Sequence, residues 1–264
     1  MKTSITQTDP QKHIRFLRGL SAFLFWMGVW VVLAAIVNKT VLLPSPREVF
    51  RVLLSLVMLP SFWGSIAASL ARILLGFIIG GASAVLLSIL CFRFPIADAL
   101  ISPVLAVIRS VPVASFIILA LVWLGRERVP SFTAFLMVLP IFTGNVIAGL
   151  KSADTSLREV CLVYRFGLWK TIRLLYLPAV RPYFLSAAHT SLGMAWKAGV
   201  AAEVLCSLSA SIGGQIYESK LYLEIPSLFA WTIMVICISM LIEKLLFHLP
   251  GLKGNLTGVK EADV

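Results

Sequence analysis

The sequence predicts an all-α, polytopic membrane protein with six transmembrane helices. Hydrophobic residues make up 59% of the 264 residues, charged residues only 13%, and the mean hydropathy is +0.95. A water-facing surface usually requires about 25% charged residues, whereas lipid-facing helices carry apolar side chains outside as well as inside. The net charge of +11 falls mainly in short segments between apolar runs, which favours a lipid bilayer and not nucleic acid as the partner.

Six apolar runs are long enough to cross a bilayer core of about 30 Å, which needs about 20 helical residues. A helix satisfies its own backbone hydrogen bonds in lipid, so each run is expected to be helical. The first run is expected to remain as a helix and not to be cleaved as a signal peptide. The expected spans are 19–37, 62–90, 97–124, 131–150, 184–207 and 227–249.

The distribution of basic residues predicts the orientation of the spans. With the N-terminus inside, thirteen Lys and Arg residues fall in cytoplasmic segments and six in outside segments. This bias favours two cytoplasmic termini. The expected organisation is a cytoplasmic segment 1–18, a transmembrane domain 19–250 that contains the long cytoplasmic loop 151–183, and a cytoplasmic tail 251–264.

The loop 151–183 is too long for a simple connection and has helical periodicity of its own. Two apolar stripes predict two short helices, with a break at Arg165-Phe166-Gly167 and an end at Leu177, because Pro178 cannot continue a helix. Such a pair could dock into a groove on a soluble partner or lie on the lipid surface. The first stripe is Leu157, Val160, Cys161 and Tyr164, and the second is Leu168, Ile172, Leu175 and Tyr176.

Several motifs carry a resemblance to a known family. Glu159-Val160-Cys161, followed by Leu177-Pro178-Ala179, resembles the "EAA" loop of the binding-protein-dependent ABC importer permeases. The segments 43–46, 69–77 and 109–114 resemble the first outside loop and the second and third spans of that family. The segments 195–203 and 213–217 resemble its nitrate/sulfonate/taurine branch.

The resemblance implies a type I ABC importer permease fold, with coupling helices between the fourth and fifth spans. The residues it implies for ATPase coupling are Leu157, Glu159, Val160, Cys161, Tyr164, Arg165, Gly167, Leu177 and Pro178. Arg165 is a departure, because it stands where the family usually has its glycine.

The same resemblance implies partners and a location. The partners are two copies of an ABC ATPase subunit, an extracytoplasmic substrate-binding protein and a second permease chain, expected to form a homodimer. The place is the bacterial inner membrane. The cargo is a nitrate-, sulfonate- or taurine-type anion, or a pyrimidine precursor of thiamine. The chain itself is expected to be no enzyme and to hold no metal or cofactor, with ATP bound by the partner subunit.

Charged residues inside spans are costly and usually face a partner or a water-filled path. Arg109, Lys197 and Glu203 are therefore candidates for the translocation pathway, and Lys197 would attract an anion there. The alternative for Lys197 is a structural ion pair, for which Glu203 of a second chain is a candidate. Two small-residue stripes, Gly76-Gly80-Ala84 and Ser191-Ala195-Gly199-Ala202, could line an interface between two chains or pack within one.

Other functions remain as alternatives. An ion-gradient-driven secondary transporter would be expected to show paired intramembrane carboxylates and an internal repeat, and neither is found. The scaffold subunit of an energy-coupling-factor transporter also docks ATPases but would lack the motifs quoted above. The sequence has no phosphate-binding G-x-x-x-x-G-K-[ST] loop, which predicts a separate ATPase subunit. Its four cysteines have no metal-binding spacing.

Overall fold

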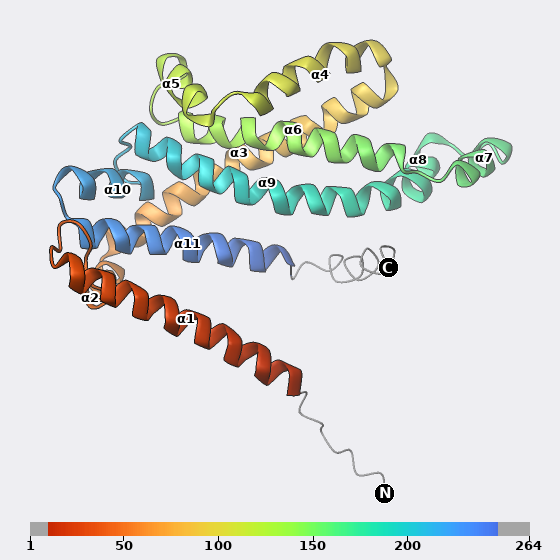
Figure 1. Ribbon diagram of the computed structural model, residues 1–264. Helices are drawn as coiled ribbons and strands as arrows, with labels where there is room; N and C mark the ends of the chain where they lie inside the picture. Colours follow the sequence, from red (N-terminus) through yellow and green to blue (C-terminus); the bar gives the residue numbers. More distant parts are fainter. Residues whose placement is uncertain (1–9, 248–264) are drawn as a thin grey trace, which may run out of the picture.

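The computed structural model describes the backbone of residues 10–247 and the side chains of residues 18–245. The described part is a bundle of long helices joined by short ones (Figure 1). The predicted tail 251–264, the last residues of the predicted sixth span and the first half of the segment 1–18 lie outside the described residues. The long helices are α1 (Pro10–Val37), α3 (Pro60–Arg93), α6 (Val129–Lys151), α9 (Leu177–Leu205) and α11 (Ile225–Phe247).

Shorter helices connect them. α4 (Pro95–Ser110) and α5 (Val113–Leu124) link α3 to α6, and α7 (Thr155–Val163) and α8 (Leu168–Thr171) link α6 to α9. α2 (Pro46–Val57) and α10 (Ile212–Leu221) lie at the opposite end of the bundle from α7 (Figure 1). Proline stands in the first turn of α2, α3, α4 and α6, where its missing N–H has no intrahelical partner to lose.

The centre of the bundle consists of α3, α6 and α9. Gly76 and Gly80 of α3 let its backbone approach α6. A Cβ at Gly76 would meet the carbonyl oxygen of Ser131, and one at Gly80 would lie 3.0 Å from that of Phe135. The Gly76 stripe therefore packs within the chain. The second stripe also does so, because a Cβ at Gly199 would lie 2.5 Å from Cγ1 of Ile73.

Two groups of helices flank this centre. α4 and α5 run along one side, against α3, α6 and α9, while α11 packs on α2, α9 and α10. α1 lies on the far side from α4 and α5 and stands largely apart from the bundle (Figure 1). Its start and the end of α11 lie at the same end of the bundle as α7 and α8 (Figure 1).

The number of spans is partly confirmed. Within the described residues, α1, α3, α6 and α11 are long and apolar enough to cross a membrane, and α4 with α5 would make a fifth span. α9, which holds the predicted fifth span, does not meet the same test of composition. It contains Arg181, His189, Lys197 and Glu203, and packs on α3 and α6, so much of its surface faces protein and need not be apolar. Six crossings remain a prediction.

The prediction of one continuous helix over 97–124 is wrong. α4 ends at Ser110, α5 begins at Val113, and their axes differ by 106°. Pro112 has no N–H for the helical ladder and disfavours the α conformation at Val111, which is extended with φ −78° and ψ 133°. The Val111-Pro112 pair was visible in the sequence as the signal for this break.

The prediction that the second loop helix ends at Leu177 is also wrong. The helix beginning at Leu168 continues into α9 through a π-helical turn, Ile172–Tyr176, in which the Leu177 N–H donates to Ile172 O. A wider turn makes room for the Pro178 ring, which would otherwise clash with a carbonyl of the preceding turn. The π-helical turn joins the loop rigidly to a long central helix.

Candidate functional site

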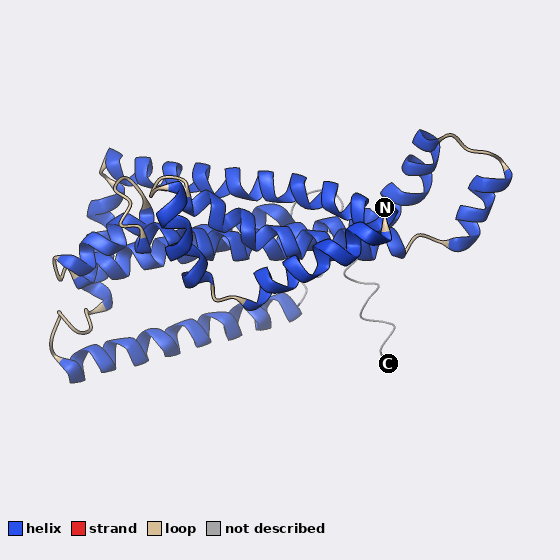
Figure 2. Ribbon diagram, turned by 90° about the horizontal axis from the view of Figure 1, so that it is seen from above, coloured by secondary structure: helices blue, strands red, loops and turns tan. Residues whose placement is uncertain are grey.

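The predicted cytoplasmic loop forms a helical projection beyond the end of the bundle (Figure 2). α7 begins at an Asp154 cap, whose Oδ1 accepts from the Ser156 N–H at 2.8 Å. Of the predicted apolar stripe on α7, only Cys161 is buried, whereas Leu157, Val160 and Tyr164 are exposed. One small side chain therefore faces inward, and most of the stripe is left uncovered by the described chain.

The turn after α7 is a Schellman motif built on a non-glycine residue. The Phe166 N–H donates to Cys161 O at 2.9 Å, and the Arg165 N–H donates to Leu162 O at 3.1 Å. Arg165 occupies the left-handed region with φ 48°, while Gly167 has an ordinary extended conformation and caps α8. The break falls where the sequence predicted it, but Arg165 and not Gly167 adopts the glycine-type angles.

The second half of the projection is ordered by local contacts. Lys170 Nζ lies 3.9 Å from the centre of the Phe166 ring, a cation–π contact across the turn. Leu177 and Pro178 are exposed at the base of the projection, just after the π-helical turn. Leu175 is the buried residue of the second predicted stripe and anchors this base to the bundle.

The outer surface of the projection is strongly apolar. Val163 is 78% exposed, Leu168 85% and Trp169 77%, and a contiguous exposed apolar patch of this kind marks a protein or membrane contact. Basic side chains, including Arg158 and Arg173, are interspersed and exposed. Such a surface suits a protein groove or a lipid interface. The exposed apolar residues are Leu157, Val160, Leu162, Val163, Tyr164, Leu168, Trp169, Ile172, Leu174 and Leu177.

Two candidate pathway cations lie exposed, Arg109 on α4 and Lys197 on α9. Nη2 of Arg109 donates to the carbonyl oxygen of Pro140 on α6 at 2.7 Å, and Lys197 projects from the exposed side of α9. Neither is within salt-bridge distance of a carboxylate in the described part of the chain. Both cations therefore lack a local anion.

Glu203 occupies a different environment, since it is fully buried. Its Oε2 accepts from Ser69 Oγ at 2.7 Å and from the Gly213 N–H at 3.2 Å, and its Oε1 lies 3.6 Å from Nη1 of Arg72. Ser69 Oγ in turn accepts from the Ile212 N–H at 2.9 Å. This Glu203 cluster therefore ties α3, α9 and the start of α10 together.

The cluster satisfies the amide groups that α10 leaves without helical partners. Ser211 caps the Gly214 N–H at 2.8 Å, while Ser69 and Glu203 take the two amides before it. Gly213 permits this approach, because a Cβ there would meet Cβ of Glu203 and the amide nitrogen of Val204. The negative carboxylate also lies at the positive end of the helix dipole.

The expectation that Glu203 lines a water-filled path, or pairs with Lys197 of a second chain, does not match this position. Its ion-pair partner, Arg72, belongs to the same chain, and the carboxyl group has no exposed surface. Sequence analysis also missed Ser69 and Ser211 as partners. The signal was weak, because single serines are common in such helices and their pairing depends on how α3 meets α10.

Comparison with known proteins identifies the family. Residues 73–249, about two thirds of the chain, match the family described as "Binding-protein-dependent transport system inner membrane component". The chain belongs to this family of ABC transporter permeases. Both the α7–α8 projection and Glu203 fall within the matched residues.

Relatives of the permease agree with the nitrate/sulfonate/taurine branch. A probable ABC transporter permease protein of Brucella melitensis biotype 1 is 30% identical over 231 residues, or 86% of this chain and 92% of that protein. A Bacillus subtilis relative, named provisionally as an aliphatic sulfonates transport permease protein, is 26% identical over 88% of this chain and 84% of its own length. A nitrate import permease protein of Synechocystis sp. is 24% identical over 90% and 89%.

The membrane location follows from the same family, whose members are inner membrane components. Among the residues that the structure describes, no group of three or more His, Cys, Asp or Glu side chains is arranged to hold a metal ion. The groups of interest in the permease are thus the apolar projection, the two exposed cations and the buried Glu203 cluster.

Proposed function

We propose that this permease forms half of the translocation pathway of an ABC importer for a small sulfonate- or nitrate-type anion, driven by a separate ATPase. The observation that carries the proposal is the apolar α7–α8 projection, which lies at the end of the bundle where α1 begins and α11 ends (Figure 1). The positive-inside distribution of Lys and Arg favours the cytoplasm for this end.

Docking of an ATPase is supported by the chemistry of the projection. Burying side chains such as Leu162 and Val163 in a groove contributes about 1.5–3 kcal/mol each, which lipid-surface binding of so short a helix would only partly provide. The Schellman turn at Arg165 and the π-helical turn connect the docked surface to α9. A movement of the ATPase would therefore be passed to a helix that spans the centre of the bundle.

An anion pathway is supported by the exposed side of α9. The exposed residues at successive turns are Ser186, Thr190, Met194, Lys197, Ala201 and Leu205. This stripe differs from the exposed side of α3, which presents Leu75, Ile78 and Leu86 in the manner of a lipid-facing surface. A stripe that contains two hydroxyl side chains and a lysine without a salt bridge suits a water-filled path or a second permease chain better than lipid.

Arg109 lies at nearly the same depth as Lys197. Ala198 of α9 packs in one cluster with Leu136 and Met137 of α6, and the two helices run in opposite directions (Figure 1). At about 1.5 Å per residue, the level of Pro140 and Gly144, where Arg109 lies, is about 3–9 Å from that of Lys197 along the bundle. Two cations within about 9 Å of each other along the bundle would raise the local concentration of an anion.

The remaining partners are proposed from the family. A substrate-binding protein would dock at the opposite end of the bundle, on the loops near 44–51 and 209–226, and a second copy of the permease would complete the pathway. Two ATPase subunits would then bind the two projections. These assignments rest on the family, whose description names transport that depends on a binding protein.

The test is retention of the ATPase. The tagged permease would be purified from its own cells in mild detergent, and co-purified ATP hydrolysis would be measured for Leu162→Glu and for the control Tyr222→Glu. Tyr222 is 72% exposed, as Leu162 is 69%, but it lies after α10 at the other end of the bundle. Losing one apolar anchor and burying a charge should reduce retention at least about tenfold for Leu162→Glu alone. Equal retention in the two variants would disprove docking through the projection.

A further inference from the structure

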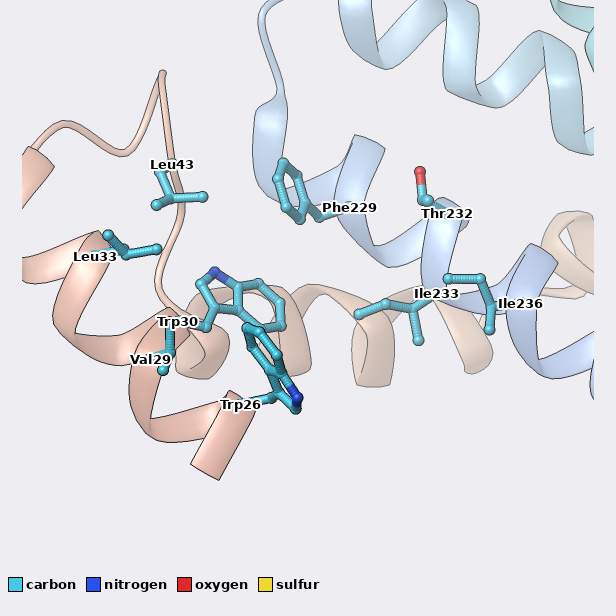
Figure 3. Close-up of a pocket in the computed structure, with 9 residues that line it drawn as sticks. All are labelled: Trp26, Val29, Trp30, Leu33, Leu43, Phe229, Thr232, Ile233 and Ile236. Atoms are coloured by element: carbon cyan, nitrogen blue, oxygen red, sulfur yellow. The ribbon is translucent and has the colours of Figure 1, made fainter. Parts of the chain in front are cut away.

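An apolar crevice separates α1 from α11. Its volume is about 430 Å³, and side chains of both helices line it together with Leu43 from the loop that follows α1 (Figure 3). The lining residues are Trp26, Val29, Trp30 and Leu33 of α1, and Phe229, Thr232, Ile233 and Ile236 of α11.

Few contacts hold α1 to the rest of the permease. The indole N–H of Trp30 donates to Pro44 O at 3.2 Å, and its ring stacks on Phe229 with centroids 5.9 Å apart. Only 6% of the apolar stretch of α1 is buried. Trp30 lies between Leu33 and Trp26 of the α1 lining, and the crevice extends to both sides of it along the helix.

The depth of the crevice matches one leaflet of a bilayer. Leu33 and Phe229 each lie four residues from the ends of their helices at this side, and Trp26 and Ile236 each lie eleven residues from them. At about 1.5 Å per residue the crevice extends from about 6 to about 16 Å below those ends. Half of a hydrocarbon core of about 30 Å is about 15 Å, so the crevice ends near the midplane.

The walls offer hydrocarbon to an occupant. Thr232 Oγ1 donates to Leu228 O at 2.8 Å and the Trp30 N–H to Pro44 O, so among the lining side chains only the Trp26 N–H has no acceptor within the described residues. A flexible hydrocarbon chain can follow the irregular apolar walls of an open crevice of this depth.

We infer that one acyl chain of a bilayer phospholipid occupies this crevice and attaches α1 to the bundle. The phospholipid belongs to the leaflet at the end of the bundle opposite α7. Its phosphate would lie near the exposed Lys39, two residues beyond the end of α1. The inference concerns the lipid face of the permease and stands independently of the proposed transport cycle.

The test is native mass spectrometry of the full chain, extracted in mild detergent from vesicles of phosphatidylethanolamine and phosphatidylglycerol. Ile233→Trp fills the crevice, and Leu241→Trp is the matched control, because Leu241 lies on the same helix outside the crevice and is 56% exposed. We expect one retained phospholipid in the wild type and in Leu241→Trp, and at least a tenfold lower occupancy in Ile233→Trp.

A second variant covers the case in which Ile233→Trp does not fold. Trp26→Ala removes one wall of the crevice, and we expect it to lower phospholipid occupancy as well. Equal occupancy in the wild type and a folded crevice variant would overturn the inference. So would a wild type that retains no phospholipid, or a crevice variant that changes the dimer population while lipid retention is unchanged, since a second permease chain would then be the occupant.

Discussion

The Glu203 cluster offers the sharpest test of how this structure is held together. Glu203→Ala removes a fully buried carboxylate that accepts hydrogen bonds from Ser69 and from the Gly213 N–H and forms an ion pair with Arg72. The substitution leaves the guanidinium and an amide at the start of α10 without this partner. Glu203→Gln keeps an acceptor for the two hydrogen bonds but loses the charge opposite Arg72.

The expected cost follows from these contacts. Arg72 keeps its contact with Glu127, but the buried Ser69 hydroxyl and the Gly213 N–H lose their acceptor and a cavity remains, which together cost about 3–5 kcal/mol. The Gln variant should cost about 1–3 kcal/mol, since only the charge-assisted part is lost. For a chain of this size about 1 kcal/mol corresponds to about 2–4 °C, so Tm should fall by about 12 °C in Glu203→Ala and about 6 °C in Glu203→Gln.

The assay is thermal unfolding of the detergent-solubilised permease, followed by tryptophan fluorescence. Glu218→Ala is the matched control, because Glu218 is an exposed residue of α10 whose substitution should change stability by less than about 0.5 kcal/mol. A Glu203→Ala protein that unfolds within 2 °C of the wild type, within about 1 kcal/mol by the same conversion, would refute the reasoning that the cluster joins the helices.

Three further substitutions test separate features. Gly213→Ala should destabilise the permease by more than about 2 kcal/mol in the same unfolding assay, because the added Cβ meets Glu203 and Val204. Gly64→Ala has open space around the new Cβ and should stabilise α3 by about 0.5–1 kcal/mol. Similar Tm values for the two variants would contradict this expectation. Arg165→Gly should relieve about 0.5–1 kcal/mol of strain from the left-handed backbone conformation of residue 165. Hydrogen exchange of the Phe166 amide should then slow about two- to fivefold. Unchanged exchange would argue against strain at this residue. Lys197→Met should lower anion uptake in the assembled importer at least about tenfold while Lys197→Arg keeps it, and equal uptake by both would remove Lys197 from the pathway.

Where the sequence was misleading, the reasons differ from helix to helix. The S-x-x-E capping signal at Ser45–Glu48 was present, and Ser45 and Glu48 do form a capping box at the start of α2, yet no helix was predicted between the first two spans. The Val111-Pro112 break was overlooked because hydropathy averages over a bend. Pro178 was given too much weight, because a π-helical turn can admit a proline without ending the helix.

The sequence alone determined the helical membrane class, most of the long apolar helices, the position of the α7–α8 loop and, through its motifs, the family. These depend on composition and local periodicity, which lipid and helix geometry constrain without reference to distant residues. The tertiary structure alone decided that Glu203 joins Arg72 and Ser69, that the Gly76 stripe packs on α6, and that a crevice separates α1 from α11. Residues more than a hundred positions apart meet in the Glu203 cluster. Their pairing depends on how the packed helices are rotated and offset relative to one another, and no local sequence pattern contains that information.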